Sequence, residues 1–152
     1  MHKDDENSAG WDIPCGGYHA TQHSKLTTER DWEGPMHYFR IYAGPDGESH
    51  FEDIEVELNA QPGGSDYSAL LPANGLIFRR SPADQFLDWH PAPRRQFVVT
   101  LSGEAEVEAS DGEVRHIGPG TLMLAEDITG KGHITRGVGS VERLSIFVTL
   151  SD

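Results

Sequence analysis

One cysteine, few basic residues and no long apolar segment set the first limits on this chain. Cys15 is the only cysteine among 152 residues, so an intramolecular disulfide is excluded and a reducing, cytoplasmic compartment is the simpler expectation. Lys and Arg number 12 against 25 Asp and Glu, which gives a formal net charge of −13. Because the chain has no basic stripe, we expect no nucleic-acid partner.

Membrane, signal and nucleotide-binding sequences are also missing. No apolar run approaches the roughly 20 residues that a transmembrane helix needs, so we expect no membrane partner. The amino terminus, MHKDDENSAG, is polar and has no apolar segment of the kind found in secretory signals. The chain lacks a Gly-x-Ser-x-Gly elbow, a Walker loop and a Gly-x-Gly-x-x-Gly motif, which argues against the enzyme classes that these motifs mark.

The first 35 residues differ in composition from the rest. Residues 1–35 are rich in Asp, Glu, His, Ser and Thr and show neither helical nor strand periodicity. A regular strand pattern begins at Met36. We therefore expect an irregular amino-terminal arm over 1–35 and one domain with a single core over 36–152.

Short strand patterns separated by turns run through the expected domain. Ile54, Val56 and Leu58 alternate with glutamates, which is typical of a half-buried strand, and Asp111-Gly112 is a hairpin turn signal. The run 97–99 is apolar on both faces, which predicts a central strand covered on both sides. No stretch sustains a helical repeat. The pattern predicts an all-β, antiparallel sandwich or barrel.

Two short motifs resemble those of the cupin family. The first cupin motif places His-x-His, then Glu, then Gly at fixed spacings, and here these positions hold His90, Ala92, Gln96 and Gly103. The second motif has the form Pro-x-Gly-x-x-His-x-x-x-Asn, and the matching stretch is 128–137. Residues 75–150 resemble a small single-domain cupin well, and the domain from residue 36 does so more loosely. The resemblance implies an antiparallel double-stranded β-helix, the jelly-roll barrel.

The second motif keeps its Gly and His but loses two other residues. Gly130 and His133 hold their motif positions, Ile128 replaces the Pro, and Gly137 stands where the family has Asn. The resemblance implies that His90 and His133 meet inside one barrel. Together with Arg94, they are our candidate catalytic residues.

A metal site is the expectation most weakened by these departures. The resemblance implies one divalent ion, manganese, iron, nickel or zinc, held by His90, Gln96 and His133, or no cofactor at all. Three protein ligands leave positions open for water or substrate. Loss of the second His and of the carboxylate weakens such a site. Substitute ligands are available nearby in the sequence, namely Asp88, Glu126 and Asp127.

Arg94 is the candidate group for binding an acidic ligand. Side chains two apart share one face of a strand, so Arg94 is expected on the same inward face as His90 and Gln96. A guanidinium suits a carboxylate. The prolines at 91 and 93 interrupt the ladder there and make this parity less secure. Other candidate cations are Arg79, Lys131 and Arg136.

Several functions fit these residues. The first is an enzyme that acts on a polar, anionic small molecule by acid–base chemistry of the isomerase or lyase type, or by metal-assisted chemistry. The alternatives are a non-catalytic module that binds or senses a small molecule, and a metal-dependent oxygenase. A carboxylate within hydrogen-bonding reach of either histidine, from Asp88 or Glu126 for example, would favour the enzyme. Backbone caps would favour the binding module. A homodimer through apolar sheet faces or edges is expected in either case.

Overall fold

The computed structural model describes residues 34–151, and all regular structure in this part of the chain is β-strand. The predicted arm, 1–35, lies outside the described residues except for its last two. The strands are β1 (His37–Ala43), β2 (Ser49–Glu55), β3 (Asn59–Ala60), β4 (Asp66–Tyr67), β5 (Ala73–Ser81), β6 (Phe86–His90), β7 (Gln96–Ser102), β8 (Glu104–Ala109), β9 (Val114–Ile117), β10 (Leu122–Glu126), β11 (His133–Val138) and β12 (Arg143–Leu150). Over these residues no helix is long and apolar enough to cross a bilayer.

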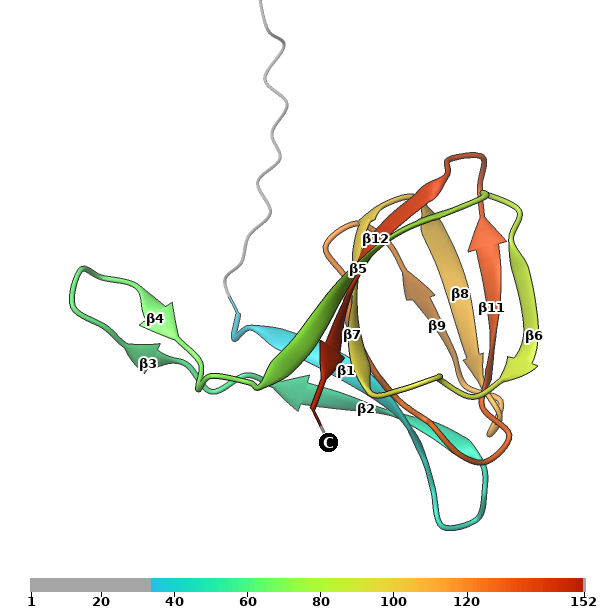
Figure 1. Ribbon diagram of the computed structural model, residues 1–152, viewed down its shortest axis with the longest axis horizontal. Helices are drawn as coiled ribbons and strands as arrows, with labels where there is room; N and C mark the ends of the chain where they lie inside the picture. The colour runs from blue at the N-terminus through green and yellow to red at the C-terminus, as the bar shows by residue number, and fades with distance from the viewer. Residues whose placement is uncertain (1–33, 152) are drawn as a thin grey trace, which may run out of the picture. The chain divides into compact units, whose positions relative to one another are not determined.

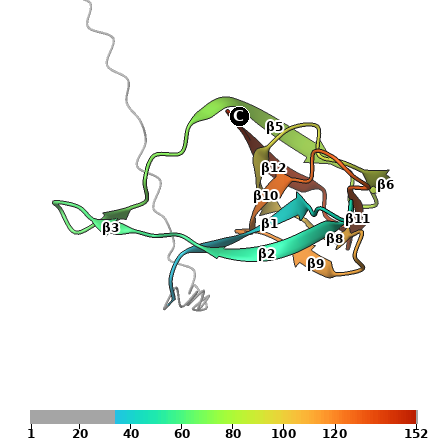
Figure 2. The ribbon, with the colours of Figure 1, turned by 90° about the horizontal axis from the view of Figure 1, so that it is seen from below.

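Two large sheets face each other across the core (Figure 1). The six-stranded sheet has the order β2-β1-β10-β7-β12-β5, and the four-stranded sheet has the order β6-β11-β8-β9. A separate short hairpin is formed by β3 and β4. This arrangement confirms the predicted all-β fold class and is consistent with a jelly roll. The expected antiparallel pairing holds for every strand pair except β1 and β10, which are parallel neighbours (Figure 2).

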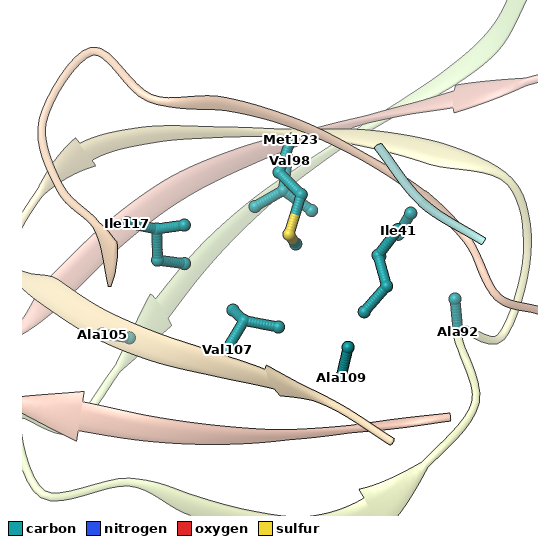
Figure 3. Packing of buried hydrophobic residues seen from close by; sticks show 9 residues of the cluster. Ile41, Ala92, Val98, Ala105, Val107, Ala109, Ile117 and Met123 are labelled. Atoms are coloured by element: carbon teal, nitrogen blue, oxygen red, sulfur yellow. The ribbon is translucent and has the colours of Figure 1, made fainter. Parts of the chain in front are cut away.

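The core lies between the inner faces of the two sheets. Along β8 the residues Ala105, Val107 and Ala109 are fully buried, and the glutamates between them point outward, because side chains alternate along a strand. Val98 and Met123 of the six-stranded sheet point toward Val107 of the other (Figure 3). The alanines are small, so the two sheets can face each other here without filling all the space between them.

The six-stranded sheet is polar inside and apolar outside over part of its area. β7 is central, as predicted, but only its inner face is fully covered within this chain: Gln96 and Thr100 are buried, whereas the outward Phe97 and Val99 are half-buried and Leu101 is 51% exposed. The expectation that residues 97–99 are covered on both sides is therefore wrong for the isolated chain. The strand has neighbours on both edges, but no second layer of the described residues fully covers its outer face.

Candidate functional site

A cavity of about 200 Å³ lies between the two sheets. Much of its wall is aliphatic, contributed by core residues of β7, β8, β9 and β10. Its polar wall combines residues from both sheets: Arg79, His90, Gln96, His133, Thr135 and Arg143. The chemistry available to a ligand in this cavity is therefore that of two imidazoles, two guanidiniums, one amide and one hydroxyl.

The two histidines come from neighbouring strands. His90 ends β6 and His133 begins β11, and they are directly opposite each other in the antiparallel ladder. Their ring centroids are 4.4 Å apart, with the ring planes inclined at 54°. The structure thus brings together the two residues that the motifs single out, and both face the same cavity.

Gly132 fixes this approach of the two strands. Its φ is +76°, and a Cβ at this position would lie 2.1 Å from the carbonyl oxygen of His90. A side chain cannot fit there, and the positive φ is itself unfavourable for L-residues. The carbonyl of Gly132 accepts a 2.7 Å hydrogen bond from the buried hydroxyl of Ser49. Glycine at this position therefore permits the contact that sets His133 against His90.

Each imidazole has its Nδ1 hydrogen-bonded and its Nε2 left without a partner among residues 34–151. His90 Nδ1 lies 2.7 Å from the carbonyl oxygen of Asp88. A carbonyl can only accept, so this nitrogen carries the proton, and the Nε2 of the neutral ring has a free lone pair. His133 Nδ1 lies 2.5 Å from Oδ2 of Asp127, and an ionised carboxylate imposes the same tautomer.

The carboxylate that reaches a histidine is neither of the two expected first. The Asp88 side chain accepts from the backbone of Trp89 at 2.9 Å, and Glu126 is engaged by arginines 40 and 95. Asp127 is fully buried, and its Oδ1 has no partner among residues 34–151. One histidine is therefore supported by a carboxylate and the other by a backbone carbonyl. Asp127 follows β10 directly, and only its place next to β11 in the fold reveals this role.

Ala92 and Gln96 occupy the two altered motif positions, and both line the cavity. Each is 4% exposed. The backbone N–H of Ala92 donates to the carbonyl of Asp127 at 3.0 Å, which ties the segment after β6 to the end of β10. A methyl group thus stands on the cavity wall where the family motif carries its second histidine.

Arg94 does not face the cavity, contrary to expectation. Residues 91–95 form a loop rather than a continuation of β6, so the strand parity that placed Arg94 inside does not apply. Its side chain is exposed. The prolines at 91 and 93 are consistent with this break, because proline supplies no N–H to a ladder.

Two other arginines supply the positive charge in the cavity. Arg79 of β5 and Arg143 of β12 each donate through Nη2 to Oε1 of Gln85, at 3.0 and 3.2 Å. Burial lowers the pKa of Arg79; burial, and then the charge of Arg79, lowers the pKa of Arg143. Both still carry their charge near neutral pH, because an arginine is not deprotonated in this range. Arg143 lies 53 residues from His90 in the sequence, in an ordinary strand pattern, and no local signal singles it out.

The donor set fits a tightly held divalent ion poorly. No cluster of three or more His, Cys, Asp and Glu side chains suited to a metal occurs in the described part of the chain. The cavity offers two imidazoles and the neutral amide of Gln96, together with two cationic guanidiniums. Divalent ions are usually held by at least three good donors, often with negative charge among them. We therefore derive no chemical step through a metal.

Comparison with known proteins finds matches only among solved structures. No protein family model matches the chain. No curated protein matches it either. The conserved protein SPY1581 of Streptococcus pyogenes, of unknown function, is 20% identical over 56% of this chain and 72% of its own, with a TM-score of 0.40. NMB1881 of Neisseria meningitidis is 15% identical over 64% and 84%, with the same TM-score.

A third structure is that of a Salmonella typhimurium protein named for ethanolamine utilization, protein Q. It is 16% identical over 78% of this chain and 99% of its own, again with a TM-score of 0.40. Similarities of this size carry no conclusion about activity. The functional assignment therefore depends on the residues of the cavity.

Proposed function

We propose that this chain is a small cupin-like enzyme that moves a proton on a small, anionic molecule bound in the cavity. The observation that carries the proposal is the contact of His90 with His133 on the cavity wall, with Asp127 behind His133. Two imidazoles with free Nε2 atoms supply both a proton acceptor and a proton donor near neutral pH. The chemistry is of the isomerase or lyase type.

His133 is the general base in this proposal. Its Nε2 accepts a proton from the ligand, and the ring then carries a positive charge beside the buried carboxylate of Asp127. Asp127 keeps the ring in the required tautomer and stabilises its charged form, as a carboxylate does for the histidine of a catalytic triad. Asp127 is thus a positioning residue that acts through His133.

His90 is the general acid. Its Nδ1 is fixed on the carbonyl of Asp88, so Nε2 is the atom that exchanges protons with the cavity. When protonated, His90 returns a proton to a second atom of the ligand, giving isomerisation, or protonates a leaving group, giving elimination.

Two alternatives rest on particular observations. The backbone cap on His90 favours a module that binds an anion without turnover, because no carboxylate supports the charged form of that ring. The metal-assisted alternative, including the oxygenase, rests on the two free Nε2 atoms with Gln96 between the same walls. Membership of the cupin family is supported by the motif positions and the two facing sheets. The single cysteine supports a cytoplasmic setting.

Solvent deuterium exchange tests the proposal. Short carboxylic acids that bind in a thermal-shift screen are incubated with the protein in D₂O, and loss of a carbon-bound proton is followed by NMR. We expect exchange with the parent protein and loss of exchange in His133→Gln and His90→Gln, with binding retained. His116→Gln, a change at an exposed histidine outside the cavity, is the control. Binding without exchange would favour the binding module. Exchange that appears when metal is added and disappears when the metal is chelated would favour the metal-assisted alternative.

A further inference from the structure

We propose that Arg79 and Arg143 form a clamp for the carboxylate of the ligand, so that the substrates are short-chain carboxylic acids. This inference rests on the proposed function and names the substrate class for the same cavity. The clamp consists of the two guanidiniums and Gln85, which holds both of them. It lies on β5 and β12 of one sheet, whereas the histidines lie on β6 and β11 of the other.

Arg143 is a buried cation with unused donor capacity. It is 4% exposed, and its Nη1 is buried without a hydrogen-bond partner in the described part of the chain. The charge of a buried arginine is normally balanced by a carboxylate. Here the partner is the neutral amide of Gln85, and no carboxylate of residues 34–151 lies within ion-pair distance of either Arg79 or Arg143. Because Arg143 lines the cavity, an anion bound there would balance the charge of this guanidinium.

Acidic residues are plentiful in this chain, because Asp and Glu outnumber Lys and Arg by 25 to 12. Four arginines of the described residues form ion pairs with Asp or Glu, namely Arg40, Arg95, Arg115 and Arg136. Arg80 and Arg94 form none, but both are exposed, so water solvates their charge. Arg79 and Arg143 differ from these two because they line the cavity and still have no carboxylate among residues 34–151. This arrangement preserves their charge for an exogenous anion.

Three buried hydroxyls lie beside the clamp residues in the same sheet. Ser81 is the register partner of Arg143, and Ser145 pairs with both Arg79 and Thr100 across the sheet. The hydroxyls of these three residues are buried and have no partners among residues 34–151. Hydrogen-bonding groups left unpaired in this way are usually satisfied by water or ligand.

The size of the cavity and the charge of the clamp limit the ligand. A volume of about 200 Å³ equals about six or seven water molecules at roughly 30 Å³ each. A short acid fits this space. A planar carboxylate also matches the edge of a guanidinium, and Arg79 is held in place by packing on the ring of Phe147, 5.3 Å from its centroid. With the carboxylate at this wall, the rest of the acid extends toward the histidines.

Calorimetric titration with propionate, propionamide and inorganic phosphate tests the clamp. We expect propionate to bind, propionamide to bind at least about tenfold more weakly, and phosphate to bind more weakly than propionate. Arg143→Met and Arg79→Met should each weaken propionate binding by at least about tenfold. Ser145→Ala is a smaller change and should weaken propionate binding severalfold. It keeps the test informative if Arg143→Met does not fold. Arg80→Gln, at an exposed position of the same strand, is the matched control and should bind propionate like the parent.

The outcomes separate this inference from the proposed function. Propionate binding that survives His133→Gln but not the arginine changes supports the clamp, whether or not proton exchange occurs. Equal binding of propionate and propionamide, or unchanged binding in both arginine variants, would overturn it even if exchange is seen. Tighter binding of phosphate than of propionate would overturn the assignment to carboxylic acids.

Discussion

Replacing Asp127 by Asn should slow proton transfer at least about 100-fold while leaving the fold as stable as before. The substitution keeps the size of the side chain, and an amide oxygen can still accept from Nδ1 of His133. The charge-assisted hydrogen bond becomes a neutral one, which costs about 1 kcal/mol on the usual scale of such bonds. What changes most is the charge next to the imidazole.

The opposing effect on stability is relief of a buried charge. Asp127 is fully buried, and one of its two oxygens has no hydrogen-bond partner. An incompletely paired carboxylate in the interior carries a desolvation penalty of several kcal/mol, roughly, which Asn removes. The gain offsets the loss of about 1 kcal/mol from the weakened bond and the roughly 1–3 kcal/mol cost of the buried amide N–H groups that Asn places at the oxygen without a partner. We therefore expect Asp127→Asn to unfold at the same urea concentration as the parent, or at a higher one.

Catalysis should respond in the opposite direction. General acid–base catalysis contributes about 10² to 10⁴ in rate, and a base without its carboxylate loses most of that. Proton exchange should fall at least about 100-fold. Asp53→Asn, at an exposed aspartate paired with Arg115, is the control for both measurements. Destabilisation by more than about 3 kcal/mol, the penalty of breaking a buried pair, or unchanged exchange, would refute this reasoning.

Four further predictions concern the strand approach, the missing ligand, pH and assembly. Gly132→Ala should lower the free energy of unfolding in urea by at least about 2 kcal/mol, because of the positive φ and the backbone clash. Gly112→Ala, at a residue with positive φ but open space, is the control and should lower it by about 1 kcal/mol. Equal effects of the two substitutions would contradict the clash. Ala92→His should add a third imidazole to the cavity wall and bring near-stoichiometric zinc or manganese in elemental analysis, and no gain would show that the cavity repels the ion. Hydrogen bonds to Asp46 and Asp111 raise the pKa of His50 above 6.5, so the stability that His50 contributes is present below pH 6.5 and is lost as pH rises through the raised pKa. The melting temperature of His50→Gln should therefore approach that of the parent at high pH. A difference in melting temperature that stays constant with pH would contradict this. Light scattering should give the parent protein twice the 16.7 kDa chain mass. Phe78, on edge strand β5, is apolar and 77% exposed, so Phe78→Glu should give the monomer mass. A parent protein that is itself monomeric would refute the homodimer.

The strands and the inward faces were predictable because they follow from local alternation. The buried alanines of β8 alternate with outward glutamates in the sequence itself, and the two motif histidines fall on neighbouring strands once the jelly roll is assumed. Arg94 shows the limit of the same rule. Parity along a strand holds only while the strand continues, and the loop over 91–95 ends it.

The rest of the cavity depends on contacts that no local pattern encodes. Asp127 reaches His133 because the turn after β10 leads directly into β11, and Arg143 reaches the cavity from the last strand. Gly137 shows the same effect in the backbone. A Cβ there would lie 2.0 Å from the carbonyl oxygen of Ala83, in the loop that carries Gln85. The glycine that departs from the family motif thus makes room for the loop that holds both arginines.

Part of the six-stranded sheet carries polar side chains on its inner face and apolar side chains on its outer face. Each of these two departures has a functional explanation. The inner face of the sheet carries Arg143 and Ser145, which an ordinary core would replace by aliphatic residues, whereas its outer face carries Val99, Leu101 and Leu144, which an ordinary monomer would replace by polar ones. Natural sequences depart from local rules mainly at functional sites. Buried donors without partners among residues 34–151 support the proposed ligand inside, and exposed apolar side chains support the proposed homodimer through the outer face. The two departures share β7 and β12, so a dimer through the outer face would stiffen the same strands that hold the anion clamp.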